Sequence, residues 1–372
     1  MFTDISPSKM NRIVNCPGSV QLCRKFPKTL NNGNQSVNQS ALAHWLVKQK
    51  VVNGLDFWRF LGKSPINDQI VDGEMITHVS NYYKLIERVS FAGFGGIPDL
   101  KISQQYKIET GNFAGFGGTP DFLHYNERTE ELTIINLKYG FLPVTPYNNY
   151  QLLTYAWLFY KIHDSIPIQS VVLGIYQPRI PNRQGTYKTC KLSLKDIINY
   201  HISKIEKALR DCQLETSITR PGDHCHYCSA MLQCNSNLET CLRIVNLGGV
   251  QHGKDPTSQQ LGSQLRLFEF ASKMLTQRLK IIEAAAEYRL KKGESVEGYH
   301  LQSYNGNRYW NISDDRAKLL GIPVISKLMS PTQAEKSGFP QVLVDKYTRA
   351  KNMVKLTEIN IDQVNERLKN EY

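Results

Sequence analysis

The spacing of apolar residues predicts helices in the first half of the chain. Residues 38–53 have helical spacing, with Ser40 as the expected N-cap and Asn53-Gly54 as the end of the helix. The segment 148–163, NNYQLLTYAWLFYKIH, forms a second helix. Because this second helix is strongly apolar, we expect it to be largely buried.

Two further helices are expected closer to the C-terminus. Ser193 and Asp196 form a capping-box pattern at the start of a helix that runs to about Cys212. A long helix is predicted over residues 263–292, because apolar residues recur there on one stripe. The stripe residues are Leu265, Phe268, Leu275, Leu279 and Ile282.

Strands are predicted between and after these helices. Residues 83–140 are strand-like with glycine-rich turns, and they contain a repeat, FAGFGGIPDL at 91–100 and FAGFGGTPDF at 113–122, with an offset of 22 residues. The repeat is too short for a solenoid, so we interpret it as a duplicated β-hairpin. Further strands are expected at 168–180 and at 298–310.

The order of helix, strands, helix, strand and helix indicates an α/β core. Residues 245–262 have the composition of a linker, which divides the chain into 1–244, the linker, and a C-terminal extension, 263–372. No apolar run approaches 18 residues and the N-terminus carries no signal-peptide pattern, so we expect no membrane span and a cytoplasmic location.

The charge balance favours a polyanionic partner. The net charge is +12, and residues 1–50 carry seven Lys and Arg residues against Asp4 alone, a net charge of +6. A solvated basic surface is the plain interpretation, and a groove that follows phosphates is the functional one. The candidate DNA contacts are Lys9, Arg12, Arg24 and Lys25.

The segment TIINLKYG, residues 133–140, is a candidate catalytic strand. Side chains alternate along a strand, so Asn136 and Lys138 share one face. A hairpin would place the carboxylate of Asp121 beside position 136, where oxygen ligands could hold a divalent cation such as Mg²⁺ or Mn²⁺. Lys138 could then orient the attacking water or stabilise developing charge. An ordinary surface strand ending in lysine is the alternative.

Two helices add candidate residues. His44 lies within an apolar helix, where a histidine is either a core or surface residue or a metal ligand that faces carboxylates. Gln151 and Tyr155 are four residues apart and therefore share a helical face. They form either a polar edge on a buried helix or a pair that packs over the catalytic strand and holds DNA or Lys138.

The cysteines give the clearest pattern among the candidate sites. The chain has eight, and CHYCSAMLQC places Cys225, Cys228 and Cys234 at a spacing typical of a metal or cluster site. A fourth ligand must come from elsewhere, with Cys16 as the first candidate, followed by Cys23 and Cys241. Thiolate ligands suit either an iron–sulfur cluster or zinc, and the spacing does not separate them.

Together these segments resemble the RecB-type branch of the PD-(D/E)XK nucleases that carry an iron–sulfur cluster, and more narrowly a family of phage and prophage proteins with this core. The resemblance spans nearly the whole chain. It implies a restriction-endonuclease-like core with a central mixed sheet flanked by helices, closed by an iron–sulfur clamp and followed by an α-rich extension. The matching segments include SPSKMNRIVNCPGSVQLC, ALAH, GFGGTPD, INLKYG, NNYQLLTYA, IYQPRI, PGDHCHYC, GNRYWN and SPTQAEKSG.

The resemblance also implies roles for residues. His44 and Asp121 match metal ligands, Lys138 matches the catalytic lysine, and Gln151 and Tyr155 match a paired glutamine and tyrosine. The matches to the 4Fe-4S ligands are Cys16, Cys225, Cys228 and Cys234.

Position 136 departs from the family pattern, because it holds Asn where the family has an acid. The repeat supplies a second candidate acid, Asp99, but no acid-x-Lys triplet follows it at the distance of a hairpin. We therefore discount Asp99 and expect the site to be complete except at Asn136.

We expect a metal-dependent DNA exonuclease of phage recombination or replication, acting on single-stranded or double-stranded ends and weakened or inactivated by Asn136. A phage single-strand-binding or annealing protein is a further candidate partner. The alternatives are a non-catalytic DNA-binding protein that retains the nuclease fold and a zinc-stabilised interaction module.

Overall fold

The computed structural model divides the chain into two compact units, Met1–Arg278 and Leu279–Tyr372. Most of the linker predicted at 245–262 lies outside the described residues, and 258–262 are helical. The described residues are 4–26, 35–66, 69–91, 105–180, 185–246, 257–310, 314–322, 324–325, 327–328 and 330–358.

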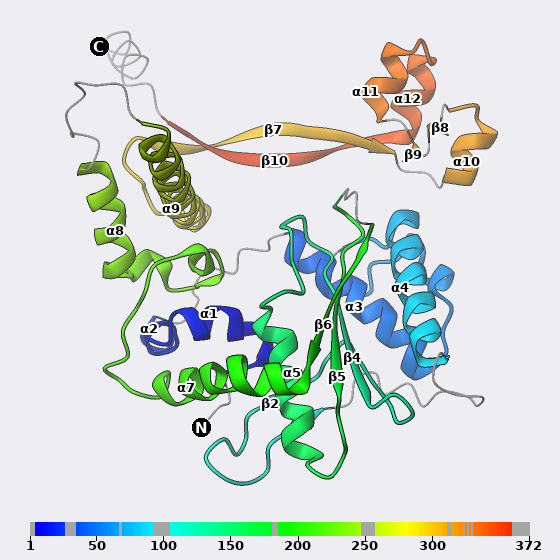
Figure 1. Ribbon diagram of the computed structural model, residues 1–372. Coiled ribbons are helices and arrows are strands. Elements are labelled where there is room, and N and C mark those ends of the chain that lie inside the picture. Colours follow the sequence, from blue (N-terminus) through cyan, green and yellow to red (C-terminus); the bar gives the residue numbers. More distant parts are fainter. Residues whose placement is uncertain are drawn as a thin grey trace. The chain divides into compact units, whose positions relative to one another are not determined.

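A mixed four-stranded sheet is the centre of the first unit (Figure 1). Its strands, in spatial order, are β3 (Phe122–Asn126), β4 (Glu131–Leu137), β5 (Ser170–Tyr176) and β6 (Tyr187–Ser193). The β4–β5 pair is parallel, and the two outer pairs are antiparallel. The expected α/β class with a mixed sheet flanked by helices is therefore confirmed.

Helix α5 (Tyr150–Ile162) makes the crossover that a parallel β4–β5 pair requires. Asn149 caps it by accepting hydrogen bonds from the backbone N–H groups of Gln151 and Leu152. With α1 (Met10–Asn15) and α7 (Ser203–Asp211), α5 covers one face of the sheet (Figure 1). The core on this face includes Met10, Ile134, Trp157, Leu173 and Ile205.

Helices α3 (Gln35–Asn53) and α4 (Gly73–Phe91) cover the opposite face (Figure 1). The 3-10 turn Phe57–Phe60 joins them in a second core. Because both faces are covered, β4 is buried at six consecutive positions rather than at alternate ones. The second core includes Leu46, Tyr82, Phe122, Ile135 and Leu137.

The expectation of strand from residue 83 is wrong over 83–91, which end helix α4. The reason is visible in the buried residues of this helix, which recur three or four positions apart. They include Met75, Val79, Tyr82 and Ile86.

The expected N-cap of the first predicted helix is also corrected. Helix α3 begins at Gln35, so Ser40 lies inside it and its carbonyl oxygen accepts a hydrogen bond from His44. The helix ends at Asn53 as predicted, and Gly54 follows with φ of 66°, the left-handed conformation that favours glycine.

The second copy of the repeat forms part of a small hairpin. Strand β1 (Tyr106–Lys107) pairs with β2 (Gly117–Gly118) in antiparallel register. The first copy, apart from Phe91 at the end of α4, lies outside the described residues, as does Asp99.

The helix predicted from Ser193 is present, with Ser193 as the N-cap of α6 (Leu194–Ile197). A π-helical turn, Ile198–Ile202, joins α6 to α7, and Cys212 caps the end. The remaining elements of the first unit are the turn Pro7–Lys9, α2 (Ser19–Lys25), the turns Asp223–Tyr227 and Met231–Gln233, α8 (Asn235–Asn246) and α9 (Ser258–Lys291), which continues past Arg278.

Helix α9 confirms the long helix predicted at 263–292. The five residues of its predicted stripe are exposed, and the buried positions are Ala271 and Met274. No helix in the described parts of the chain is long and apolar enough to cross a membrane.

The second unit contains a long antiparallel ribbon of β7 (Tyr299–Trp310) and β10 (Thr348–Glu358). The strand predicted at 298–310 is therefore confirmed. The shorter elements of this unit are α10 (Asp314–Leu319), β8 (Val324–Ile325), β9 (Lys327–Leu328), α11 (Pro331–Lys336) and α12 (Gln341–Tyr347).

Candidate functional site

The end of strand β4 carries the candidate site. Asp121 directly precedes β3, and Phe122 is opposite Ile135 in the antiparallel register. This pairing brings the Asp121 carboxylate to the end of β4, where its Oδ2 accepts a hydrogen bond of 2.9 Å from the backbone N–H of Leu137. Asp121 therefore lies beside position 136, as the hairpin argument requires.

Helix α3 brings His44 to the same carboxylate. His44 Nε2 lies 3.2 Å from Asp121 Oδ2, and His44 Nδ1 lies 2.7 Å from the carbonyl oxygen of Ser40. A carbonyl only accepts, so Nδ1 carries a proton. Nε2 donates to Asp121 when the ring is protonated, and in the neutral ring it is the nitrogen that could bind a metal. The side chains of His44 and Asp121 are 36% and 20% exposed, so the pair is accessible from solvent.

Helix α5 supplies the partner of the lysine. Lys138 Nζ donates a hydrogen bond of 2.7 Å to Gln151 Oε1. One turn further along the same face, the Tyr155 hydroxyl donates to the carbonyl oxygen of Thr119 at 2.9 Å. Thr119 lies two residues before Asp121. Gln151 and Tyr155 of α5 therefore position both Lys138 and the segment that carries Asp121.

Electrostatics link the three charged groups. Burial lowers the pKa of His44, but the charge and hydrogen bond of Asp121 outweigh it, so the pKa lies above its ordinary value. Burial raises the pKa of Asp121, yet His44 and Lys138 hold it below its usual range. Burial lowers the pKa of Lys138, partly offset by Asp121. Asp121 is therefore an ionised oxygen donor between two basic groups.

Asn136 differs from the other residues of the site because its side-chain oxygen has no partner. It is buried, and its Oδ1 has no hydrogen-bond partner. An unsatisfied buried polar atom costs about 1–3 kcal/mol, so a structure rarely keeps one without a reason. Beside Asp121 and His44, this oxygen would be a third donor of the kind that binds hard cations, although an amide is neutral.

The four cysteines predicted as ligands line one small cavity together with residues of α2 and the 219–224 segment. The backbone N–H of Arg220 donates to Cys16 Sγ at 3.2 Å, and that of Gly222 donates to Cys225 Sγ at 3.4 Å. Cys16 follows α1, and the other three belong to the 3-10 turns between α7 and α8. Segments about 200 residues apart in sequence therefore meet at the sulfurs.

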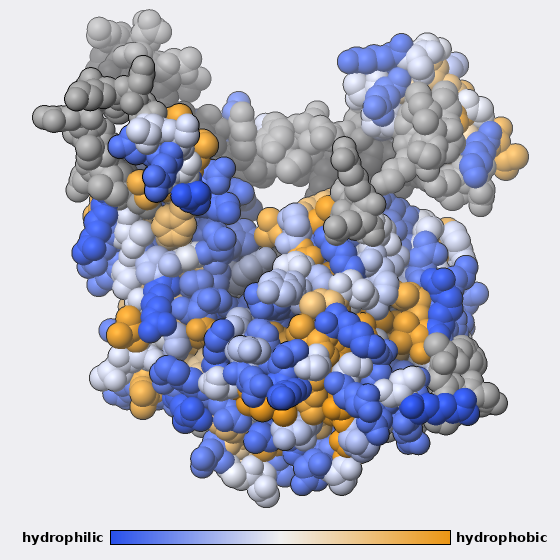
Figure 2. Space-filling view, viewed as in Figure 1, coloured by the Kyte–Doolittle hydropathy of each residue, from blue (hydrophilic) through white to orange (hydrophobic). Residues whose placement is uncertain are grey.

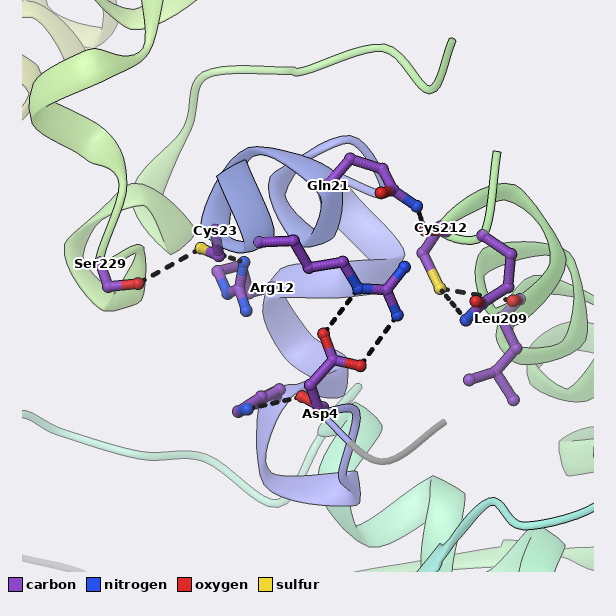
Figure 3. Close-up of polar contacts among 10 residues, drawn as sticks. Asp4, Arg12, Gln21, Cys23, Leu209, Cys212 and Ser229 are labelled. Carbon is purple, nitrogen blue, oxygen red and sulfur yellow. Dashed lines mark hydrogen bonds and ion pairs between the residues drawn. The ribbon is translucent and has the colours of Figure 1, made fainter. Parts of the chain in front are cut away.

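Cys23, a reserve candidate in the sequence, also lies in this region. Its Sγ is 3.9 Å from Cys228 Sγ. It accepts hydrogen bonds from Ser229 Oγ at 3.3 Å and from Arg12 at 3.6 Å (Figure 3). The hydrogen bond from Cys228 is the largest influence on Cys23, whose pKa falls to about 5, while the pKa of Cys228 is raised. Cys23 is therefore close enough to Cys228 to stay a candidate for the fourth ligand beside Cys16.

As the side chains stand, the described parts of the chain contain no group of three His, Cys, Asp or Glu residues that could hold a metal ion. At the end of β4 the third donor is an amide, which is not among these residue types. The donors at the end of β4 are of types that bind divalent cations, and thiols are of the type that binds soft metals, but the described cysteines also do not form a group of three that could hold a metal ion as they stand.

The basic N-terminal residues have different environments. Arg12 is buried and donates to Ser19 Oγ at 2.6 Å, so it is omitted from the candidate phosphate contacts. Arg24 forms a two-bond ion pair with Asp4, which Figure 3 also shows, and Lys9 Nζ donates to the carbonyl oxygen of Asp4. Lys25 lies over the ring of Phe26. The visible face of the molecule is mostly hydrophilic, with separate hydrophobic patches (Figure 2).

Two residues near the site were not singled out from the sequence. Gln177 and Arg179 lie just after β5 and contact the loop that follows Lys138. The sequence feature that could have identified them is the polar segment QPR after the buried strand β5. Strand β5 is parallel to β4, and the carboxyl ends of parallel neighbours lie at one edge of a sheet, so residues after β5 lie near residues after β4.

Comparison with known proteins identifies a family. A comparison with curated proteins found no match. The family described as "Protein of unknown function (DUF2800)" matches residues 3–358, and the chain therefore belongs to this family.

Proposed function

We propose that this chain has the PD-(D/E)XK nuclease core of the RecB-type branch and acts on DNA ends. The observation that carries the proposal is the convergence at the end of β4. Asp121 contacts both His44 and the backbone beside Asn136, and Lys138 contacts Gln151. These residues come from α3, the β3–β4 hairpin and α5, so their meeting was not required by any one motif.

The residues have distinct chemical roles. Asp121 and His44 would hold a divalent cation, with position 136 as the third ligand. When bound, Mg²⁺ or Mn²⁺ supplies neutralisation of the phosphate and a water that ionises near neutral pH. Lys138 is fixed by Gln151 and can donate a hydrogen bond to the attacking water or to the phosphate oxygen where charge develops. Tyr155 keeps the segment before Asp121 in place.

The amide at position 136 makes the chain a binder of DNA that cuts slowly or not at all. The Asn136 side chain is a weaker ligand than a carboxylate because it is neutral. The exposed basic residues Lys9, Arg24 and Lys25 are separate from it and can still contact phosphates. Phosphate contacts do not depend on the base sequence of the DNA. We propose that the protein acts on DNA in the cytoplasm. A phage single-strand-binding or annealing protein is a candidate partner.

We further propose that Cys16, Cys225, Cys228 and Cys234 hold a 4Fe-4S cluster. Their placement around one cavity supports a shared ligand. Zinc is the alternative, because two sulfurs on one tetrahedral zinc are about 3.8 Å apart when Zn–S is about 2.3 Å. The Cys23 and Cys228 sulfurs are separated by 3.9 Å.

The experiment compares the protein as it stands with its Asn136→Asp variant on labelled single-stranded and blunt-ended DNA, with Mg²⁺ or Mn²⁺. We expect both to bind, with affinity falling steeply between about 50 and 200 mM salt because phosphate contacts release counterions. Only Asn136→Asp should degrade DNA at an appreciable rate, and adding Lys138→Ala should abolish that degradation.

A non-catalytic DNA-binding protein is the second candidate, favoured by the unpaired amide oxygen of Asn136. The same assay separates the two. A variant that binds DNA but stays inert on every end with either metal supports the non-catalytic candidate. Salt-independent binding, or none, contradicts both.

A further inference from the structure

The loop that follows the catalytic strand presents exposed apolar side chains to solvent. Phe141, Leu142 and Tyr147 are 59%, 49% and 63% exposed. We define the tip loop as residues 140–147. Phe141 is three residues beyond Lys138, and a chain spans at most about 3.6 Å per residue, so the two Cα atoms are within about 11 Å. The backbone of Phe141 is therefore close to that of Lys138 in the candidate site.

Gln177 forms hydrogen bonds with the backbone of the tip loop. This buried side chain donates to the carbonyl oxygens of Gly140 and Leu142 at 2.9 and 2.8 Å, and its Oε1 accepts from the backbone N–H of Val144 at 3.0 Å. Three hydrogen bonds from one buried amide fix the backbone on both sides of the exposed pair.

The far end of the tip loop is fixed by the cap of α5. Asn149 Nδ2 donates to the carbonyl oxygen of Thr145 at 3.0 Å, and the backbone N–H of Tyr147 donates to Thr145 Oγ1 at 3.2 Å. Asn148 adopts φ of 53°, in the left-handed region that costs energy for a residue other than glycine. The exposed rings are thus preorganised, which lowers the entropy cost of binding.

A cation lies against the exposed ring. The Arg179 guanidinium carbon is 3.9 Å from the centroid of Phe141, and the same guanidinium donates to Gln39 Oε1 at 2.6 Å. The guanidinium stacks on one face of the ring and brings positive charge to it. The apolar ring could stack on a nucleobase while the neighbouring cation contacts the phosphate attached to it.

We propose that Phe141, supported by Arg179 and Gln177, stacks on an unpaired base of the DNA strand that enters the site, so that the preferred substrate is single-stranded or frayed. This inference rests on the proposed function. Aromatic side chains bind single strands without sequence preference because every base has a π-face. The exposed set is small and adjoins the Arg179 guanidinium, which fits a nucleotide better than a protein surface.

The test uses the chain with its native Asn136, which should bind DNA without degrading it. The probes are a single-stranded oligonucleotide with 2-aminopurine near one end and a hairpin-closed duplex without free ends, and both are followed by fluorescence anisotropy. Loss of one stacked base costs about 1–3 kcal/mol, so Phe141→Ala should weaken single-strand binding roughly 5- to 150-fold. The quenching of 2-aminopurine should be lost with it, and affinity for the closed duplex should hold.

Matched variants separate stacking from general damage. Phe141→Trp should keep both affinity and quenching, whereas Phe141→Leu keeps apolar area without an aromatic face and should lose them. Trp58→Ala removes an aromatic side chain of similar exposure, 57%, on the turn Phe57–Phe60, outside the tip loop, and should change nothing. Unchanged melting temperatures would exclude unfolding.

Three results would overturn the inference. If Phe141→Ala binds the single strand as tightly as the parent, the loop does not stack on DNA and a protein partner becomes its candidate occupant. If the closed duplex loses affinity equally, the loop contacts the backbone and not an unpaired base. If the parent binds no DNA at all, the proposed function fails first, and this result is distinguishable from the other two.

Discussion

At the scale of single residues, the molecule is organised around one carboxylate. Asp121 accepts from Leu137, faces His44 and lies near Lys138. Each neighbour stabilises its ionised form, and each would have to adjust if a metal bound there. The pKa of His44 reports this competition most directly, because a metal requires the neutral ring.

The first prediction concerns this histidine. Asp121 raises the pKa of His44 above its ordinary value of 6.5, against the effect of burial. In Asp121→Asn the opposing charge is gone, and burial should bring the pKa below 6.5. Imidazole titration by NMR measures both values. A pKa that does not fall would mean that Asp121 does not act on His44.

The same pair sets a pH window for stability. The folded pKa of His44 is raised, so its contribution is full below about 6.5 and is lost as the pH rises through the raised value. The folded pKa of Asp121 is lowered, so its contribution exists above about 3.8 and is lost as the pH falls. Denaturant unfolding of the parent and Asp121→Asn should therefore differ most between about pH 4 and 6.5. An equal difference at every pH would contradict this.

At the scale of elements, the hydrophobic pattern predicted helices α3, α5, α6–α7 and α9 and strands β5 and β7, but not strand β6, the other helices or every boundary. Helix α5 and strand β5 were predictable because the apolar residues are concentrated there. Residues 83–91 were misassigned because the repeat suggested a strand, although the apolar spacing from Met75 onward is helical. The candidate residues of the site could be listed from motifs, Cys23 among them, but the closeness of Cys23 to Cys228 could not be predicted because it depends on tertiary packing.

The second prediction concerns the junction between α2 and the cysteine-bearing turns. A Cβ on Gly18 would lie 2.4 Å from the carbonyl oxygen of Ser217, which is backbone and cannot easily move. Gly18→Ala should therefore lower the free energy of unfolding by about 1–3 kcal/mol, the usual cost of overpacking. The measurement is chemical denaturation.

Gly73→Ala is the matched control, because nothing lies within 4 Å of its added Cβ and the position starts helix α4. This variant should be neutral or slightly stabilising, since alanine favours helix. Equal losses in the two variants would show that the close approach at Gly18 does not matter.

At the scale of the whole molecule, the cysteine region joins distant parts of the first unit. Gln21 donates to the carbonyl oxygen of Cys212 at 2.9 Å, and Arg278 of α9 donates to the carbonyl oxygens of Met231 and Leu232 at 3.0 Å each. The N-terminal helices, the 3-10 turns and α9 therefore meet around the sulfurs. A bound cluster would strengthen a junction that hydrogen bonds already form.

The third prediction concerns the group that the cysteines of that junction bind. Protein purified without oxygen should be brown and contain iron and sulfide, and Cys225→Ser should reduce both the colour and the yield of folded protein. Comparing Cys16→Ser with Cys23→Ser identifies the fourth ligand, because only the ligand's loss should bleach the spectrum. Colourless protein with about one zinc per chain would contradict the cluster.

The central claim is that Asn136 occupies the position of a metal-binding carboxylate, and a Mn²⁺ titration by calorimetry tests it most directly. The parent should bind weakly, whereas Asn136→Asp should bind at least tenfold more tightly, with about one high-affinity site per chain that Asp121→Ala removes. The melting temperature of Asn136→Asp should then rise with added Mn²⁺. Equal and weak binding by the parent and the Asn136→Asp variant would contradict the claim.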